Sequence, residues 1–402
     1  MNIKRLITKL SNFFLVIFII LTVLPVKLNY SSIAIIILVL LSISNIILFK
    51  SRNQKSIKYS IFIVSIPLIV YIFGLINTKD IKYGIDFLSK SMSFLAFPLI
   101  FFSLSEYIKK EKLFKYFLLG LFITNLYLIY LFFYYINFGL KFYKIVTVDI
   151  YHSTYLGMYS LFAYWICINL FRKKDKKALL LLAIFFLFSA IICSSRIIFI
   201  LSLISVMMTL ISAFKSNFKK VVAVVFTSLV FIIAMLSIPS TKQKFNQFLE
   251  IQKIGFDKDN YRSLSSRFAK IEASIAVLKD NIWIGTGTGD AEEKLVQQYK
   301  KMNFTMGYKK RYNPHNQYLD NLTRNGLIGG IISLLVIYLF PFYISIKSNE
   351  KLLLAFILII AGVSLTESIL VRHRGIVFYA FFVSLMLNSV NASKSINNKL
   401  LK

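Results

Sequence analysis

About twelve runs of apolar residues, most of them close to 20 residues long, divide the sequence into membrane-sized segments. A helix needs about 20 apolar residues to cross the hydrocarbon core of a bilayer. A mean hydropathy of +0.70, with 57% hydrophobic and 16% charged residues, lies well outside the soluble globular range. The sequence therefore predicts an all-α polytopic membrane protein with about twelve transmembrane helices, at residues 13–26, 33–49, 59–76, 87–104, 113–136, 154–171, 178–193, 197–214, 221–238, 327–346, 352–370 and 376–390.

Two local features are interpreted as parts of this helical bundle. The first apolar run follows Lys4, Arg5 and Lys9 as a signal peptide would, but no small-residue cleavage site comes after it. We therefore expect a retained helix. The only two cysteines, Cys167 and Cys193, lie in or at the end of apolar runs without metal-ligand or disulfide spacing, so we interpret both as packing residues.

The basic residues orient the predicted helices across the membrane. Forty-eight Lys and Arg against 17 Asp and Glu give a formal charge of +31, which in a soluble chain would suggest nucleic-acid binding. Here most cations fall in short gaps between apolar runs, and short basic loops stay in the cytoplasm. The even-numbered loops and both ends of the chain are basic, whereas the odd-numbered loops carry fewer cations. We therefore expect an inner (cytoplasmic) membrane protein with both termini in the cytoplasm.

One connection is much longer than the others and divides the chain into three parts. We expect a bundle of about nine spans at residues 1–238, an extracytoplasmic catalytic loop at residues 239–324, and a bundle of about three spans at residues 325–402. Long loops translocate largely regardless of their charge, so the cations of this loop do not overturn its outer placement. Its helical patterning and aromatic residues argue against disorder, and long ordered connections are usually functional.

The predicted topology gathers isolated polar residues on the outer side of the membrane. Arg196 follows a serine pair in a tight turn between two apolar runs, and Arg372 and Arg374 precede the last run. All three histidines, at positions 152, 315 and 373, are expected on this side. A snorkelling anchor would explain Arg196. The short turn leaves it little room to leave the membrane surface, so we favour binding of an anionic headgroup.

Within the long loop, residues 263–279 read as an amphipathic helix. Ser265 or Ser266 would cap it, and an apolar face would consist of Phe268, Ile271, Ile275 and Leu278. Arg267 then lies in the first turn, where a cation is unfavourable against the helix dipole unless an anion also occupies the helix N-terminus. This mismatch favours phosphate binding by Arg267; a solvated surface arginine is the alternative.

Three glycines follow this helix, at positions 285, 287 and 289. They resemble a phosphate-cradling loop only superficially, because no Lys-Ser or Lys-Thr pair follows them as in a nucleotide-binding P-loop. We expect them to provide backbone turns that let the loop fold back on itself.

The sequence from Asn313 onward is the sharpest local signal. Asn313 is a good helix cap and Pro314 suits the first helical position, which would place His315 in the first turn of a helix leading into the next span. The positive end of a helix favours the neutral imidazole that a general base needs. Asp320 lies roughly 140° around such a helix from His315, so an acidic partner must come from elsewhere in the fold. A capped helix with an incidental surface histidine is the alternative.

These segments together resemble one family. The sequence contains SSR between two apolar runs, then SSRF…AVLKDNIWIGTGTGD, then PHNQYLDNLTRNGLIGG at the entrance to the next run. This pattern is similar to that of the O-antigen ligase and O-antigen polymerase superfamily. The resemblance covers about residues 152–332, and the first five spans match only in hydrophobicity.

The resemblance implies a GT-C-like, metal-independent membrane glycosyltransferase that takes a glycan from undecaprenyl diphosphate on the outer face. Arg196 and Arg267 match the arginines that hold the lipid diphosphate, and His315 matches the histidine that helps to activate the acceptor hydroxyl. The adjacent Asn316 is a candidate for substrate binding. Bidentate hydrogen bonds from two arginines can neutralise a diphosphate leaving group, and a neutral histidine can take a sugar hydroxyl's proton. No Asp-rich metal motif and no cofactor motif is apparent on the outer face.

Weaker candidates complete the predicted site. The segment around His152 and Tyr155 also looks like a pattern of this superfamily, and these residues would line the acceptor or glycan path. Arg372 and Arg374 are further substrate-binding candidates, with Glu367 as their expected partner. Interfacial anchors would have the same appearance in the sequence.

Two questions remain open at the level of sequence. The acceptor is the lipid A core in a ligase and another repeat unit in an O-antigen or capsule polymerase, and we place the ligase first because the HNQYL pattern resembles ligases closely. A transporter or flippase of lipid-linked glycans also suits twelve spans. Transporters usually carry mid-membrane ionisable groups and repeated halves; here Lys90 and Glu367 are nearly alone and no internal repeat is visible.

Overall fold

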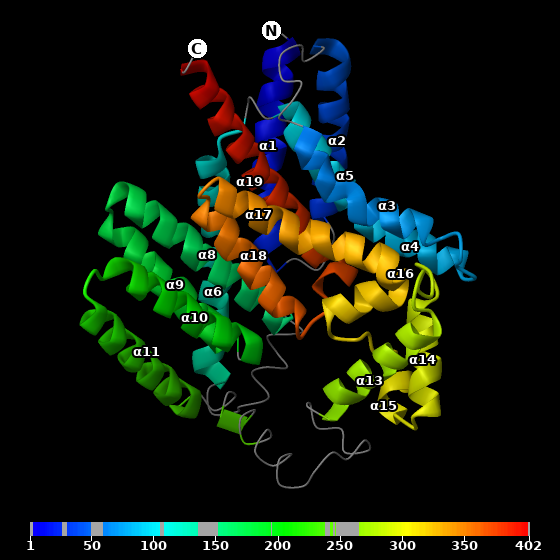
Figure 1. The fold of residues 1–402 in the computed structure, drawn as a ribbon. Coiled ribbons are helices and arrows are strands. Elements are labelled where there is room, and N and C mark those ends of the chain that lie inside the picture. The colour runs from blue at the N-terminus through cyan, green and yellow to red at the C-terminus, as the bar shows by residue number, and fades with distance from the viewer. Residues whose placement is uncertain are drawn as a thin grey trace.

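The computed structural model describes residues 3–25, 30–49, 59–104, 108–135, 152–193, 195–237, 242–243, 246 and 265–400, the last ten of these by their backbone alone. The described segments are helical and contain no strand (Figure 1). This confirms the prediction of an all-α polytopic membrane protein. In chain order, the first half comprises α1 (Ile3–Val23), α2 (Tyr30–Phe49), η1 (Tyr59–Ser65), α3 (Ile66–Phe73), α4 (Ile81–Ser91), α5 (Ser93–Leu104), α6 (Lys110–Tyr135), α8 (Ser153–Lys174), α9 (Lys177–Ile192), α10 (Arg196–Ala213) and α11 (Asn217–Ser237).

The second half begins with three helices of the predicted outer loop and continues into the last bundle. Its elements are α13 (Ser265–Asp280), α14 (Ala291–Lys301), α15 (Thr305–Lys309), α16 (Gln317–Leu334), η5 (Leu335–Leu339), α17 (Phe340–Lys347), α18 (Lys351–Ser364), η6 (Ile369–Val371) and α19 (His373–Leu400). Of these, η5 is a single π-helical turn that joins α16 and α17 into one long helix.

All twelve predicted apolar runs coincide with helices. Among the described residues, nine helices are long and apolar enough to cross a membrane. The other three runs form shorter apolar helices, at Ile61–Phe73, Lys177–Ile192 and Lys351–Ser364. Nine of the described helices are therefore candidate spans, and the number of twelve spans remains a prediction.

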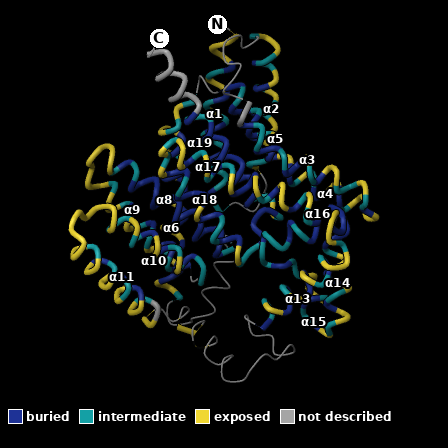
Figure 2. Tube along the Cα trace, viewed as in Figure 1, coloured by how far each residue is buried: buried dark blue, intermediate teal, exposed yellow. Residues whose placement is uncertain are grey.

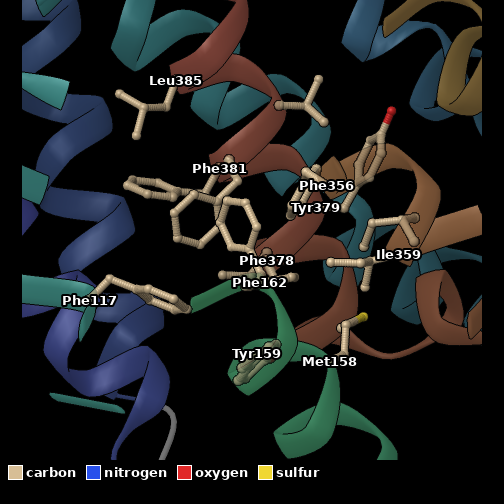
Figure 3. Close-up of a cluster of buried hydrophobic side chains, with 14 of the residues drawn as sticks. Phe117, Met158, Tyr159, Phe162, Phe356, Ile359, Phe378, Tyr379, Phe381 and Leu385 are labelled. Carbon is tan, nitrogen blue, oxygen red and sulfur yellow. The ribbon is translucent and has the colours of Figure 1, made fainter. Parts of the chain in front are cut away.

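Two helices form the centre of the bundle. In α8 and α19, 83% and 78% of the most apolar window is buried inside the protein, against 17% in α10 and α11 (Figure 2). Aromatic rings fill the space between the central helices: Phe162 of α8 packs edge-to-face against Phe356 of α18 (Figure 3). Phe162 also packs edge-to-face against Phe382 of α19. Edge-to-face packing suits the ring quadrupoles, and tight packing is what holds helices together in lipid.

The helices of the outer loop have a small core of their own. It consists of Ala269, Ala273, Val277, Leu295, Tyr299 and Phe304, contributed by α13, α14 and the turn before α15. In Figure 1 these helices lie at the end of the bundle opposite both chain termini. The connection between α11 and α13, which belongs to the predicted catalytic loop, lies mostly outside the described residues, and the three predicted parts remain a prediction.

Candidate active site

Two glycines allow the segment between α13 and α14 to cross α16 at a kink inside that helix. The loop glycine Gly285 has φ +73°, and Gly326, at a kink inside α16, has φ +65°. A Cβ on Gly326 would lie 2.3 Å from the Trp283 carbonyl oxygen, so no larger residue fits without a shift. The backbone N–H of Thr286 donates to the Thr323 carbonyl at 3.0 Å. Gly285 and Gly287 therefore have the positive φ that suits glycine, whereas Gly289 does not.

The helix that follows His315 starts later than the sequence indicates. Asn313 does not cap it, and Pro314 is not its first residue. The cap is Asn316, whose Oδ1 accepts from the backbone N–H of Leu319 at 3.0 Å. Asn313 instead accepts from the backbone N–H of His315 at 3.0 Å and closes a local turn in which His315 has φ +49°. His315 therefore stands just before the helix rather than in its first turn.

The carboxylate partner of His315 is Glu367, in the turn between α18 and η6. Nδ1 of His315 and Oε2 of Glu367 lie 3.0 Å apart, and both side chains are largely buried. An ionised carboxylate only accepts hydrogen bonds, so Nδ1 carries a proton, and in the neutral form of the ring Nε2 has the lone pair. From the sequence, Glu367 is predicted to pair with Arg372 and Arg374. Its ion pair is with His315, because the turn after α18 folds over the start of α16.

Three consecutive residues after His315 hold that turn in place. The side-chain amide of Asn316 donates to the Leu365 carbonyl at 3.3 Å. Oε1 of the buried Gln317 accepts from the backbone N–H of Leu370 at 2.6 Å, and the Tyr318 hydroxyl donates to the Ala361 carbonyl at 2.9 Å. The HNQY sequence thus provides the catalytic candidate and also positions the segment that carries Glu367.

Nearby positive charges keep Glu367 ionised. Burial alone would raise the pKa of this carboxyl group, but the net shift is downward. The hydrogen bond from His315, together with electrostatic interactions with His315, His152 and Arg267, lowers the pKa of Glu367. Residues from α8, α13 and the start of α16 therefore act on a single carboxylate.

The helix α13 contributes two cations to this region. Arg267 lies in its first turn, as predicted. The buried face differs from the predicted one: Ala269, Ala273 and Val277 are buried, whereas Phe268 and Ile275 are 49% and 39% exposed. Small residues let α13 approach α14 and α16 closely.

The second cation of α13, Lys270, was missed by the sequence analysis. It is only 5% exposed, and its Nζ lies 4.1 Å from the centre of the Tyr312 ring. That ring in turn contacts the His315 imidazole edge-to-face, at 6.1 Å between centroids. Burial is the main reason that the pKa of Lys270 falls to about 8, because removing an ammonium group from water disfavours its charged form.

The starts of α8 and α10 place three more predicted residues together. Arg196 is the first residue of α10 and follows the cap residue Ser195. The Ser195 hydroxyl lies 3.2 Å from the hydroxyl of Thr154, which stands between His152 and Tyr155 on α8. The Tyr155 hydroxyl donates to the Ile369 carbonyl of η6 at 3.3 Å. Arg196, His152 and Tyr155 thus lie at adjoining helix starts, next to the segment that carries Glu367.

The arginines before α19 lie at the edge of this region. Arg372 is exposed and Arg374 is half-buried, and both act electrostatically on Tyr155. The histidine between them points elsewhere: His373 Nε2 lies 3.1 Å from the Ser32 hydroxyl. His373 therefore belongs to the contact between α19 and α2.

Asp320 and Arg324 have a structural role. They form a buried pair one turn apart on α16, 3.3 Å between Oδ1 and Nη2, and Arg324 also lies over the Phe87 ring. This explains why Asp320 is not the partner of His315, as predicted. In the part of the chain that the structure describes, no group of three or more His, Cys, Asp or Glu side chains could hold a metal ion.

Comparison with known protein families gives a match over part of the chain. Residues 178–334 match a protein family described as O-antigen ligase. The match begins in α9, includes Arg196, Arg267, Lys270 and His315, and ends with α16. No curated protein matches the chain significantly.

Proposed function

We propose that this chain, whose residues 178–334 belong to the O-antigen ligase and polymerase superfamily, transfers a glycan from undecaprenyl diphosphate to an acceptor on the outer face of the inner membrane. A membrane glycosyltransferase of this superfamily is what the family match supports. The observation that carries the specific proposal is the His315–Glu367 pair, which lies within electrostatic reach of Arg267. In glycosyl transfer from a diphosphate, a base can take the proton of the acceptor hydroxyl and a cation can stabilise the leaving diphosphate.

The proposed reaction is a direct displacement at the sugar. The acceptor hydroxyl oxygen bonds to the anomeric carbon, and the bond from that carbon to the phosphate oxygen breaks. Undecaprenyl diphosphate leaves with the electron pair, and the hydroxyl proton passes to Nε2 of His315. Glu367 holds the ring so that Nε2 faces the substrate and stabilises the imidazolium that forms.

The arginines are proposed to stabilise the leaving group. Arg267 and Arg196 bind oxygens of the diphosphate, whose negative charge grows as the bond breaks. Guanidinium groups can supply this charge stabilisation without a metal ion. His152, Tyr155, Asn316, Arg372 and Arg374 are proposed to line the glycan and acceptor path.

The acceptor distinguishes two forms of this proposal. We place a ligase first, with the lipid A core as acceptor, because the HNQYL sequence that positions Glu367 is the part that most resembles ligases. A polymerase of O-antigen or capsule repeat units would use the same donor chemistry. A transporter or flippase is the third reading; histidine and carboxylate groups also form proton relays in transporters, so the complementation test decides between the two classes.

The test is a surface-glycan gel from a deletion strain complemented with wild type, His315→Ala, Arg267→Ala or Lys301→Ala. Lys301 is an exposed cation of α14 outside the site, so its variant controls for loss of charge. A ligase deletion gives complete lipid A core without polymer, while polymer accumulates on undecaprenyl diphosphate. A ladder that collapses to one repeat unit on the core indicates a polymerase. Full complementation by both site variants would refute the catalytic assignment and favour a transporter.

A further inference from the structure

Lys270 is a buried cation without a carboxylate partner. Its side chain is 5% exposed, and among the described residues no carboxylate oxygen lies within ion-pair distance of Nζ. The contact recorded for this ammonium is the face of the Tyr312 ring, at 4.1 Å. Buried lysines are rare unless they are paired, because a buried charge loses its hydration. An aromatic face compensates only part of that loss.

The groups around Lys270 define what could complete its environment. Arg267 precedes it by three residues on α13, so the two cations lie on neighbouring positions of one helix face. Glu367 is close enough to act on Lys270 electrostatically, but its carboxylate is hydrogen-bonded to His315. The titratable and charged groups on the elements packed around α13 include Glu292, Glu293, Lys294, Tyr299, Lys300 and Lys301 of α14, Tyr312 and His315 before α16, the Asp320–Arg324 pair of α16, and Glu367.

This arrangement has an excess of positive charge at the start of α13. Arg267 and Lys270 lie in the first two turns of a 16-residue helix, where the helix dipole adds a further positive potential. Two cations at a helix N-terminus form a site for an anion. Among the described residues, the carboxylate that acts on Lys270 is already hydrogen-bonded to His315, so an anionic ligand is the group that we consider for these two cations.

We propose that the ammonium of Lys270 binds a phosphoryl oxygen of the lipid diphosphate, beside Arg267. This inference rests on the proposed function and adds a residue to its donor site. A lysine presents a compact charge with three N–H donors, which complements the planar fork of an arginine on the same phosphate. The Tyr312 ring, which contacts Lys270, also packs against the His315 imidazole. A diphosphate bound at Lys270 would therefore lie near the proposed base.

The experiment measures both binding and transfer with the full chain in lipid nanodiscs. Binding of undecaprenyl diphosphate gives Kd, and transfer from a lipid-linked glycan gives the donor KM and kcat. The variants are Lys270→Met, Lys270→Arg and Lys279→Met. Methionine keeps the aliphatic stem and removes the charge, and the exposed Lys279 at the end of α13 is the matched control.

We expect Lys270→Met to weaken Kd and raise the donor KM by roughly tenfold or more, the effect of losing one charge-assisted hydrogen bond. Lys270→Arg recovers most of the affinity, and Lys279→Met matches wild type. A merely structural lysine would leave Kd unchanged in folded Lys270→Met protein, and that result overturns the inference. If Lys270→Met does not fold, the test uses Lys270→Arg instead. The inference then requires that Kd depends on pH in wild type and not in Lys270→Arg.

The binding arm separates this inference from the proposed function. Wild type that binds undecaprenyl diphosphate but transfers nothing contradicts the proposed function, and Lys270 is then judged on Kd alone. Wild type that transfers, together with Lys270→Met that binds equally well, overturns only the role of Lys270. Wild type that does not bind the diphosphate overturns both.

Discussion

At the scale of single residues, His315 and Glu367 form one unit, joined by a hydrogen bond of 3.0 Å. Glu367→Gln keeps the shape of the side chain but removes the charge that fixes the imidazole tautomer. We expect kcat to fall by about 10- to 100-fold, as for other orienting residues, and His315→Ala to lose about 100-fold or more. The donor KM should change little in either variant.

The double variant tests whether the two residues act together. Because Glu367 acts only through the imidazole, His315→Ala with Glu367→Gln should be no slower than His315→Ala alone. Purified variants assayed for kcat at saturating donor provide the measurement. Multiplicative losses would show that Glu367 has an independent role and would contradict the assignment.

Titration of Lys270 should affect binding and stability in opposite directions. The pKa of Lys270 in the folded protein is lowered to about 8 from 10.5, mainly by burial. Donor affinity should therefore be full below about pH 7 and fall as the pH rises through 8. Between pH 8 and 10.5 the unfolded chain holds more of this proton, so stability without donor should rise with pH. Lys270→Arg should show neither effect.

Measurements of Kd and Tm on the same preparations across this pH range check both trends. A lysine with only a structural role would give the stability trend without the loss of binding. Equal pH profiles in wild type and Lys270→Arg would show that another group titrates.

Short motifs allow part of this site to be predicted from the sequence. Arg267 and His315 stand in local patterns that identify a helix start and a capped turn. Glu367 and Lys270 do not stand in such patterns, because their roles depend on which helices pack together. Glu367 lies 52 residues from its partner His315 in the sequence. The sequence of α13 presents Phe268 and Ile275 as an apolar face, and only the contacts with α14 and α16 turn Lys270 inward instead.

At the scale of elements, the crossing of the outer loop over α16 depends on backbone conformations that only glycine adopts readily. Gly326→Ala would place a Cβ 2.3 Å from the Trp283 carbonyl oxygen at φ +65° and ψ −168°. Such a conformation costs about 1–3 kcal/mol for a residue other than glycine, before any clash. We expect Tm in detergent to fall by several degrees, with a loss of activity.

Gly329→Ala is the matched control on the same helix. Its Cβ would lie 2.8 Å from Cγ1 of Val70 and 3.0 Å from Cβ of Asn325, so the Val70 side chain must shift, but its backbone φ is not positive. Alanine also favours the helix over glycine. If both variants lower Tm equally, the special backbone at position 326 is not what holds the loop.

The positions of the helices could be predicted from the sequence, but several helix ends could not. Each apolar run became a helix, because lipid leaves the backbone few other ways to satisfy its polar groups. The start of α16 was wrong by several residues: Asn313 and Asn316 are equally good caps in sequence, and the turn closed by Asn313 decides between them. The kink at Gly326 is likewise a tertiary feature, imposed by the loop that crosses it.

At the scale of the whole molecule, α13, which carries Arg267 and Lys270, lies at the end of the bundle opposite both termini (Figure 1). Orientation therefore decides which substrates it can meet. Nucleotide sugars are made in the cytoplasm, so an enzyme that faces outward needs a donor that carries its own activated bond through the membrane. A glycan on a lipid diphosphate has that bond, and the cations at the start of α13 suit its leaving group.

A lipid-linked donor is needed only if both termini are cytoplasmic and residues 239–324 are extracytoplasmic, as predicted. Single-cysteine labelling can test this orientation. Both native cysteines are buried, so Cys167→Ala and Cys193→Ala give a silent background. In intact cells a membrane-impermeant maleimide should label Lys301→Cys on α14, whereas Ser216→Cys, between α10 and α11, should react only after permeabilisation. Both positions are exposed, so access depends on sidedness alone. Labelling of Ser216→Cys in intact cells would show that the protein has the opposite orientation. His315 would then face cytoplasmic substrates, and the reason to expect a lipid-linked donor would disappear.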